Sequence, residues 1–143
     1  MTIHRVVFDT STLVSAALRP DSIPFQALLK AMSSCDLCAC EATLTELKEV
    51  LAREKFRRYL PDGAREKFLR SIETSVRRFV VREEDCVSLD PACRDPKDNK
   101  FLALAAEAEV EVLVSSDEDL LVLDPWREVR VVRPAEFLNL IGS

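Results

Sequence analysis

The chain has 143 residues, of which 48% are hydrophobic and 31% charged, and its formal net charge is −5. This length and balance suit one soluble domain with its own core, and we expect residues 1–143 to form a single domain. With only two glycines and one histidine, the sequence excludes a glycine-rich phosphate-binding loop and an H-E-x-x-H metal site, and it argues against histidine acid–base catalysis.

Apolar runs typical of buried strands alternate with helical patterns along the chain. Strands are expected at Ile3–Phe8, Leu37–Cys40, Val112–Val114 and Val129–Val132, and an extended segment at Phe79–Arg82. Helices are expected from about Thr12, over Ser22–Met32 and Ala42–Arg53, from Asp62 to about Val76, over Asp95–Glu109, after Asp117 and from Pro134. This alternation predicts an α/β fold of three layers, in which a mostly parallel sheet has helices on both faces.

Five cysteines occur without a recognisable export signal, which favours reduced thiols. The spacing Cys35-x-x-Cys38-x-Cys40 leaves a zinc site as an alternative, but Cys86 and Cys93 are seven residues apart and have no histidine nearby. No apolar run approaches the length of a membrane span. We therefore expect a cytoplasmic protein that does not contact a membrane.

Positive charge is concentrated in one segment. Residues 53–82 carry ten Lys and Arg side chains but only four Asp and Glu side chains, although the whole chain is acidic. One interpretation is a solvated helical pair with i,i+4 salt bridges. The other is a basic arm that follows a phosphate backbone, with Arg57 and Arg58 as candidate RNA-binding residues.

Two acidic residues follow predicted strands. Asp9 ends the run Val6-Val7-Phe8, and Asp117 follows Val112–Val114 after two serines. Ligands of open parallel sheets bind beyond the carboxyl ends of the strands. An acid at either position alone is more often a cap of the next helix, and the ligand-binding interpretation stays open beside it.

Two further acids lie on helices that also carry apolar stripes. Asp98 shares a helix face with Phe101, Leu102 and Ala105, where a carboxylate needs a partner or a metal; its position near the start of the helix makes a dipole-stabilising role the alternative. Glu46 flanks the apolar stripe of its helix, whereas Glu49 lies opposite that stripe.

Four carboxylates from four elements would repel one another in one pocket unless cations intervened. Hard divalent ions with oxygen ligands are the usual solution. Two ions of this kind, Mg²⁺ or Mn²⁺, would assist displacement at a phosphoryl group by lowering the pKa of a water molecule, so no histidine base is required.

The sequence resembles the PIN-domain family, in particular the VapC-like toxins of toxin–antitoxin pairs. The resemblance rests on four short segments in the family's order, which together span nearly the whole chain: VVFDTSTLVSAAL at Val6–Leu18, TELKEVLAREKF at Thr45–Phe56, DPKDNKFLALA at Asp95–Ala105 and VSSDEDLL at Val114–Leu121. It implies a PIN-like fold and a metal-dependent endoribonuclease with Mg²⁺ or Mn²⁺ in an acidic active site. Ser115-Ser116 stands where the family often has Thr-Gly, and Thr45 where a second glutamate is frequent.

Carried over position by position, the resemblance assigns catalysis and metal binding to four residues, Asp9, Glu46, Asp98 and Asp117. It adds Asp119 as a candidate further ligand, Ser11 as a small polar residue that can hold water at the metal, and Asn99 with no defined role. The implied partners are an RNA substrate and an antitoxin protein, and we also expect a homodimer.

Two alternatives remain. A haloacid-dehalogenase-type phosphatase would need a second aspartate two residues after Asp9, where the chain has Ser11. A catalytically silent PIN-like module that binds RNA or serves as a scaffold would be expected to have lost acids, and this chain keeps all four.

Overall fold

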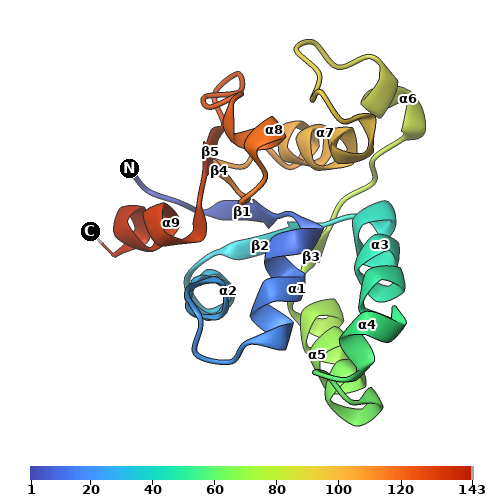
Figure 1. Ribbon diagram of the computed structural model, residues 1–143. Coiled ribbons are helices and arrows are strands. Elements are labelled where there is room, and N and C mark those ends of the chain that lie inside the picture. Colours follow the sequence, from blue (N-terminus) through green and yellow to red (C-terminus); the bar gives the residue numbers. More distant parts are fainter. Residues whose placement is uncertain (143) are drawn as a thin grey trace.

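Five parallel strands form one sheet in the order β3-β2-β1-β4-β5 (Figure 1). The computed structural model describes residues 1–142. The strands are β1 (Arg5–Phe8), β2 (Asp36–Ala39), β3 (Arg77–Arg78), β4 (Val112–Val114) and β5 (Arg130–Val132). The predicted α/β fold with a parallel sheet is confirmed.

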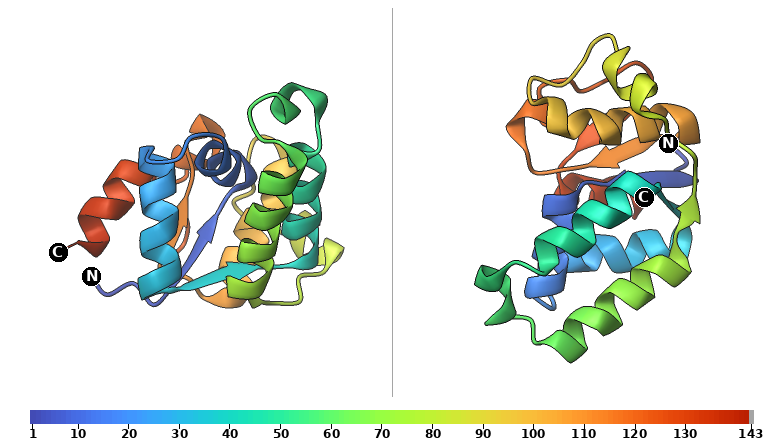
Figure 2. Two further views of the ribbon diagram at one scale, coloured as in Figure 1. Left: turned by 90° about the horizontal axis from the view of Figure 1, so that it is seen from below. Right: turned by 90° about the vertical axis from the view of Figure 1, so that its right-hand side faces the viewer.

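Helices connect the strands and cover both faces of the sheet. Their bounds are α1 (Thr10–Leu18), α2 (Ile23–Ser34), α3 (Glu41–Leu51), α4 (Glu54–Arg57), α5 (Asp62–Ser75), α6 (Glu83–Val87), the 3-10 turn η1 (Pro96–Asp98), α7 (Asn99–Ala108), α8 (Glu118–Leu121) and α9 (Pro134–Ile141). Figure 2 shows α7 on one side of the sheet and α1, α2, α3 and α5 on the other.

Alternating side chains of the strands point into two hydrophobic cores, one on each face of the sheet. Val6 and Phe8 of β1 point into the core beneath α1, α2 and α9, whereas Val7 between them points into the core beneath α7. Leu113 of β4 joins Val7 on the α7 side. Successive strand residues face opposite sides of a sheet. Both sides are apolar here, which is why Val6–Phe8 of β1 and Val112–Val114 of β4 are continuous apolar runs.

Several predicted element bounds differ from the structure. β3 is Arg77–Arg78, directly before the predicted extended segment Phe79–Arg82; this two-residue edge strand is built from exposed arginines, so it lacks the apolar signal of a buried strand. Asp62 begins α5 as its first residue, while Pro61 occupies the cap position. The Asp62 carboxylate instead forms an ion pair with Arg65, at 3.2 Å.

The five cysteines are free thiols. Cys38, Cys40 and Cys93 are buried in the α7-side core, whereas Cys35 packs at the edge of the other core. Burial raises the pKa of the Cys38 thiol to about 11. The residues of the Cys35-x-x-Cys38-x-Cys40 spacing therefore divide between the two faces of the sheet.

Sheet order fixes where a ligand can enter. The chain passes from β1 to β2 on one side and later returns to place β4 on the other side of β1. In parallel α/β sheets the crevice for a ligand lies at this reversal, beyond the carboxyl ends of the two strands. Here it lies beyond Phe8 and Val114, which are paired in register.

Candidate active site

A cavity of about 480 Å³ opens at the carboxyl ends of β1 and β4. We call it the acidic cavity because five carboxylates line it, those of Asp9, Glu46, Asp95, Asp98 and Asp117. The structure thus brings together all four of the acids predicted from the sequence, which belong to segments up to 108 residues apart. Ser11, also predicted, lines the same cavity.

Asp9 is the most buried of these acids, with 3% of its surface exposed. Its Oδ1 accepts hydrogen bonds from the backbone N–H of Thr12, at 3.0 Å, and from the Ser11 hydroxyl, at 3.3 Å. Its Oδ2 accepts a hydrogen bond of 2.5 Å from Ser115. Asp9 therefore caps α1 and lines the cavity at once, so the two interpretations of this residue are compatible. Burial raises its pKa, although the three donors act in the opposite direction.

Asp98 does not act as a helix cap. It lies where η1 passes into α7, and its side chain accepts no capping hydrogen bond, because Asp95 caps η1 by accepting from the Lys97 N–H at 3.0 Å. Within the described residues, Asp98 Oδ2 is buried and receives no hydrogen bond. A buried carboxylate oxygen without a donor is costly, so this atom is a candidate ligand for a cation.

The surroundings of Asp98 raise its pKa to about 7. Burial is the largest cause, followed by the contact with Asp117 and then by the charges of Asp95 and Asp9. A proton or a cation must lie between two adjacent carboxylates if both are to stay in place. Asp117 also caps α8 by accepting from the Asp119 N–H at 2.9 Å, which fixes its position beside Asp98.

Glu46 reaches the cavity from α3, and Glu49 of the same helix is exposed, as the apolar stripe predicts. Glu46 Oε2 accepts a hydrogen bond of 2.5 Å from Lys100 Nζ. Lys100 belongs to α7, and the same Nζ donates to the Lys97 carbonyl oxygen. This ion pair ties α3 to α7 across the cavity and neutralises one of its carboxylates.

The donor set of the acidic cavity fits a divalent cation better than any neutral ligand. Oxygen ligands from carboxylates are those that Mg²⁺ and Mn²⁺ prefer. The raised pKa of Asp98 reflects first its burial and then the repulsion by neighbouring carboxylates, and a cation would offset both. Across residues 1–142, however, no three Asp, Glu, His or Cys side chains are already arranged to hold a metal ion. For Glu46 to act as a metal ligand here, it would have to exchange Lys100 for the ion.

Four other predicted residues lie outside the acidic cavity. Asn99 is buried, and its Oδ1 accepts a hydrogen bond of 2.7 Å from the Cys93 N–H, so it holds the loop before η1. Asp119 does not line the cavity; its backbone N–H donates a hydrogen bond to the Asp117 carboxylate. Arg57 forms an ion pair with Asp62 at 3.8 Å, and Arg58 lines a neighbouring cavity.

Several residues of the site were not identified from the sequence, among them Asp95 and Lys97, which line the cavity. Ser115 is fully buried and holds Asp9, Lys100 binds Glu46, and Arg53 lines the cavity at the start of α4. The partners of Ser115 and Lys100 are 106 and 54 residues away. The only local signal was the Ser115-Ser116 pair after β4, which the resemblance marked as a departure from the family's pattern.

Comparison with known proteins identifies the family of the chain. A PIN-domain family model matches residues 5–119, which includes β1, the acidic cavity and β4. The chain belongs to the PIN-domain family. No curated protein sequence matches the chain.

Solved structures share the fold of this PIN domain at low sequence identity. PAE2754 from Pyrobaculum aerophilum is 14% identical with a TM-score of 0.66, covering 98% of this chain and 91% of its own. VapBC2 from Rickettsia felis, solved bound to a DNA fragment from its promoter, is 10% identical with a TM-score of 0.62, covering 89% and 96%. VapC20 from Mycobacterium tuberculosis, described as a toxin that cleaves the sarcin–ricin loop, is 17% identical with a TM-score of 0.57, covering 87% and 98%.

The helices of this PIN domain are short. None of those in residues 1–142 is both long and apolar enough to cross a membrane.

Proposed function

We propose that this PIN domain is a Mg²⁺- or Mn²⁺-dependent endoribonuclease, the toxin of a toxin–antitoxin pair. The observation that carries the proposal is the convergence of Asp9, Glu46, Asp98 and Asp117 on one cavity, with a buried Asp98 oxygen that receives no hydrogen bond among the described residues. A cluster of this kind costs stability in the absence of a cation, and a structural role does not require it.

Different residues of the cavity would bind the cations, orient Asp9 and attract the RNA phosphates. Asp9, Asp98 and Asp117 would hold the cations, and Glu46 would join them on leaving Lys100; bound ions of this type lower the pKa of water and stabilise charge on a phosphoryl group. Ser115 and Ser11 orient Asp9 through their hydroxyls. Arg53 and Lys97, which line the same cavity, place positive charge where an RNA phosphate would approach.

The proposed activity is tested by incubating the full chain with mixed single-stranded and structured RNAs. We expect cleavage in Mn²⁺ or Mg²⁺, none in EDTA, and none by the Asp117→Asn variant in either condition. Equal cleavage in EDTA would contradict the metal-dependent mechanism. RNA binding without cleavage in any metal would identify a silent RNA-binding module instead.

The toxin role adds an antitoxin partner, a homodimer and a cytoplasmic location to the proposal. Its support is the structural likeness to VapBC2 and VapC20. Co-expression with a small protein encoded in the neighbouring reading frame should relieve growth arrest and yield a co-purifying complex. Light scattering of the isolated chain tests the dimer directly.

A further inference from the structure

A second cavity, of about 850 Å³, lies beside the acidic cavity, and Leu18 and Phe56 line both. It is formed where the end of α1 meets α4 (Figure 1). Its remaining lining residues are Arg19, Glu54, Lys55, Arg58 and Tyr59. We call it the aromatic–basic cavity.

Tyr59 has 66% of its surface exposed, and in residues 1–142 it is the only aromatic among the exposed large hydrophobic side chains. The phenylalanine and tryptophan residues of the described part of the chain are all buried or partly buried. An exposed ring in water gains free energy when another flat surface stacks on it. The Tyr59 ring is therefore accessible to a ligand and is not buried in the core.

The cations of this cavity are also free. None of the ion pairs in the described part of the chain uses Arg19, Lys55 or Arg58. Lys55 Nζ lies 5.0 Å from the centroid of the Phe56 ring, so it stays beside the wall that the two cavities share. By contrast, Arg57, which lies between Lys55 and Arg58 in the sequence, forms an ion pair with Asp62.

Unpaired cations around an exposed ring are the chemistry that recognises single-stranded nucleic acid. Bases stack on the aromatic ring, and the phosphates between them contact lysine and arginine. The acidic cavity repels a phosphate chain, so a strand cut there has to be held beside it, and the adjoining cavity has the charge that complements a strand.

Resting on the proposed ribonuclease function, we propose that the aromatic–basic cavity binds the single-stranded RNA segment next to the cleaved bond. A base stacks on Tyr59, and Arg19 and Arg58 contact the neighbouring phosphates. Leu18 and Phe56 form the passage from this segment to the acidic cavity.

The test measures the affinity of the full chain for a short single-stranded RNA across a salt series, in an Asp98→Asn background that prevents cleavage. We expect Tyr59→Leu to weaken binding by about five-fold or more, with the salt dependence unchanged, because the variant loses stacking and no charge. Tyr59→Phe keeps the ring and should bind as the parent does. Arg19→Ala and Arg58→Ala should each flatten the slope of log affinity against log salt by about 0.7, the value for one phosphate contact with a single strand.

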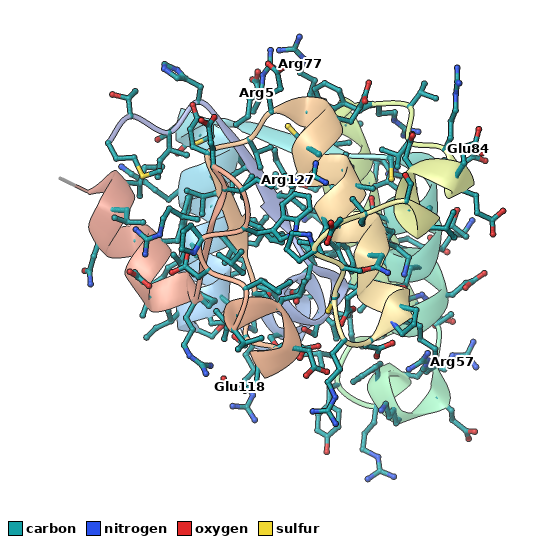
Figure 3. The ribbon with its side chains drawn as sticks, turned by 90° about the horizontal axis from the view of Figure 1, so that it is seen from above. Arg5, Arg57, Arg77, Glu84, Glu118 and Arg127 are labelled. Carbon is teal, nitrogen blue, oxygen red and sulfur yellow. The ribbon has the colours of Figure 1, made fainter. Side chains whose placement is uncertain are left out.

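Arg77→Ala serves as the matched control. Arg77 and Arg57 lie at opposite ends of the molecule (Figure 3), and Arg77 is an exposed arginine outside both cavities. This variant should change neither affinity nor slope by as much as Arg58→Ala. In addition, RNA carrying 5-iodouridine should form a photocrosslink to Tyr59, which peptide mapping would identify.

The proposal is overturned if Tyr59→Leu binds RNA as the parent does, or if crosslinks map outside the aromatic–basic cavity. It is also overturned if the Tyr59 variant binds RNA normally but no longer binds the antitoxin, since the cavity would then be a protein-docking site. The proposed ribonuclease function is separable: it fails if the wild-type chain never cleaves RNA in Mn²⁺, even when RNA binding depends on Tyr59.

Discussion

Asp98 shows at the level of one residue how burial and charge indicate function. Its Oδ2 is buried and receives no hydrogen bond within the described chain, and its pKa is raised to about 7 by burial and by neighbouring carboxylates. A helix-capping aspartate would instead accept backbone hydrogen bonds, as Asp95 does. The free energy of folding of the metal-free protein therefore includes a cost that only a cation or a proton removes.

This cost predicts a pH dependence of stability. Because the pKa of Asp98 is higher in the folded than in the unfolded chain, the folded state is favoured by protonation at low pH, and this advantage is lost as the pH rises from about 4 to about 7. In EDTA, Asp98→Asn should be more stable than wild type by ~1 kcal/mol at pH 8, with solvent screening limiting the gain. The difference should vanish near pH 4. Urea melts at both values measure it, and a less stable variant at pH 8 would show that Asp98 is structural.

Replacing Ser115 should remove a hydrogen-bond donor from the buried Asp9 carboxylate. Its hydroxyl donates to Asp9 Oδ2 and accepts from the Asp117 N–H at 2.9 Å. Ser115→Ala should lower the free energy of unfolding by about 1–3 kcal/mol, because a buried carboxylate loses a donor. It should also reduce cleavage. Ser116→Ala is the matched control at the exposed neighbouring position and should change stability by less than ~0.5 kcal/mol.

At the scale of the elements, local patterns predict most of the fold. Continuous apolar runs indicate β1 and β4, and the stripe with Leu47 and Leu51 indicates α3, because both signals depend on neighbouring residues. β3 escapes prediction since an edge strand of exposed arginines has no apolar pattern. Contacts such as Ser115 with Asp9 depend on the register of β1 against β4, which no local window contains.

The contact between α3 and α7 gives a prediction for metal affinity. Lys100 neutralises Glu46 within the acidic cavity, so a metal ion that binds Glu46 has to displace this ammonium group. Lys100→Gln should tighten Mn²⁺ binding several-fold, because the cavity gains a free carboxylate and loses a positive charge. Calorimetric titration measures the affinity, with Lys55→Gln as a control outside the acidic cavity. Weaker binding by Lys100→Gln would instead show that Lys100 holds Glu46 in its metal-binding position.

At the scale of the whole molecule, negative charge gathers in the acidic cavity, where we propose the reaction, and positive charge gathers in the adjoining cavity, where we propose that the substrate binds. The basic segment 53–82 does not form one continuous face, since Arg57 and Arg77 lie far apart (Figure 3) and both form ion pairs. Among the described residues, the cations that line the acidic cavity or the aromatic–basic cavity and form neither an ion pair nor a contact with Glu46 are Arg19, Arg53, Lys55, Arg58 and Lys97. The sequence located the segment but could not tell which of its arginines are paired.

Arg57 and Arg58, both candidate RNA-binding residues, should therefore behave differently. Arg58→Glu should weaken RNA binding and flatten its salt dependence, whereas Arg57→Glu should have a smaller effect because Asp62 already neutralises Arg57. Neither change should alter Mn²⁺ affinity. Equal losses from the two variants would mean that the strand follows the whole of α4 and not the cavity beside it.

We propose that the four carboxylates of Asp9, Glu46, Asp98 and Asp117, which line the acidic cavity, form one divalent-cation site. The most direct test is the thermal melting temperature of wild type and of Asp98→Asn, measured in EDTA and in rising concentrations of Mn²⁺. A bound ion stabilises the folded state according to its affinity, so wild type should gain ~5–10 °C at a hundredfold excess over the dissociation constant, and Asp98→Asn should gain little. A melting temperature of wild type that Mn²⁺ does not change, or an equal gain in both proteins, would contradict the claim.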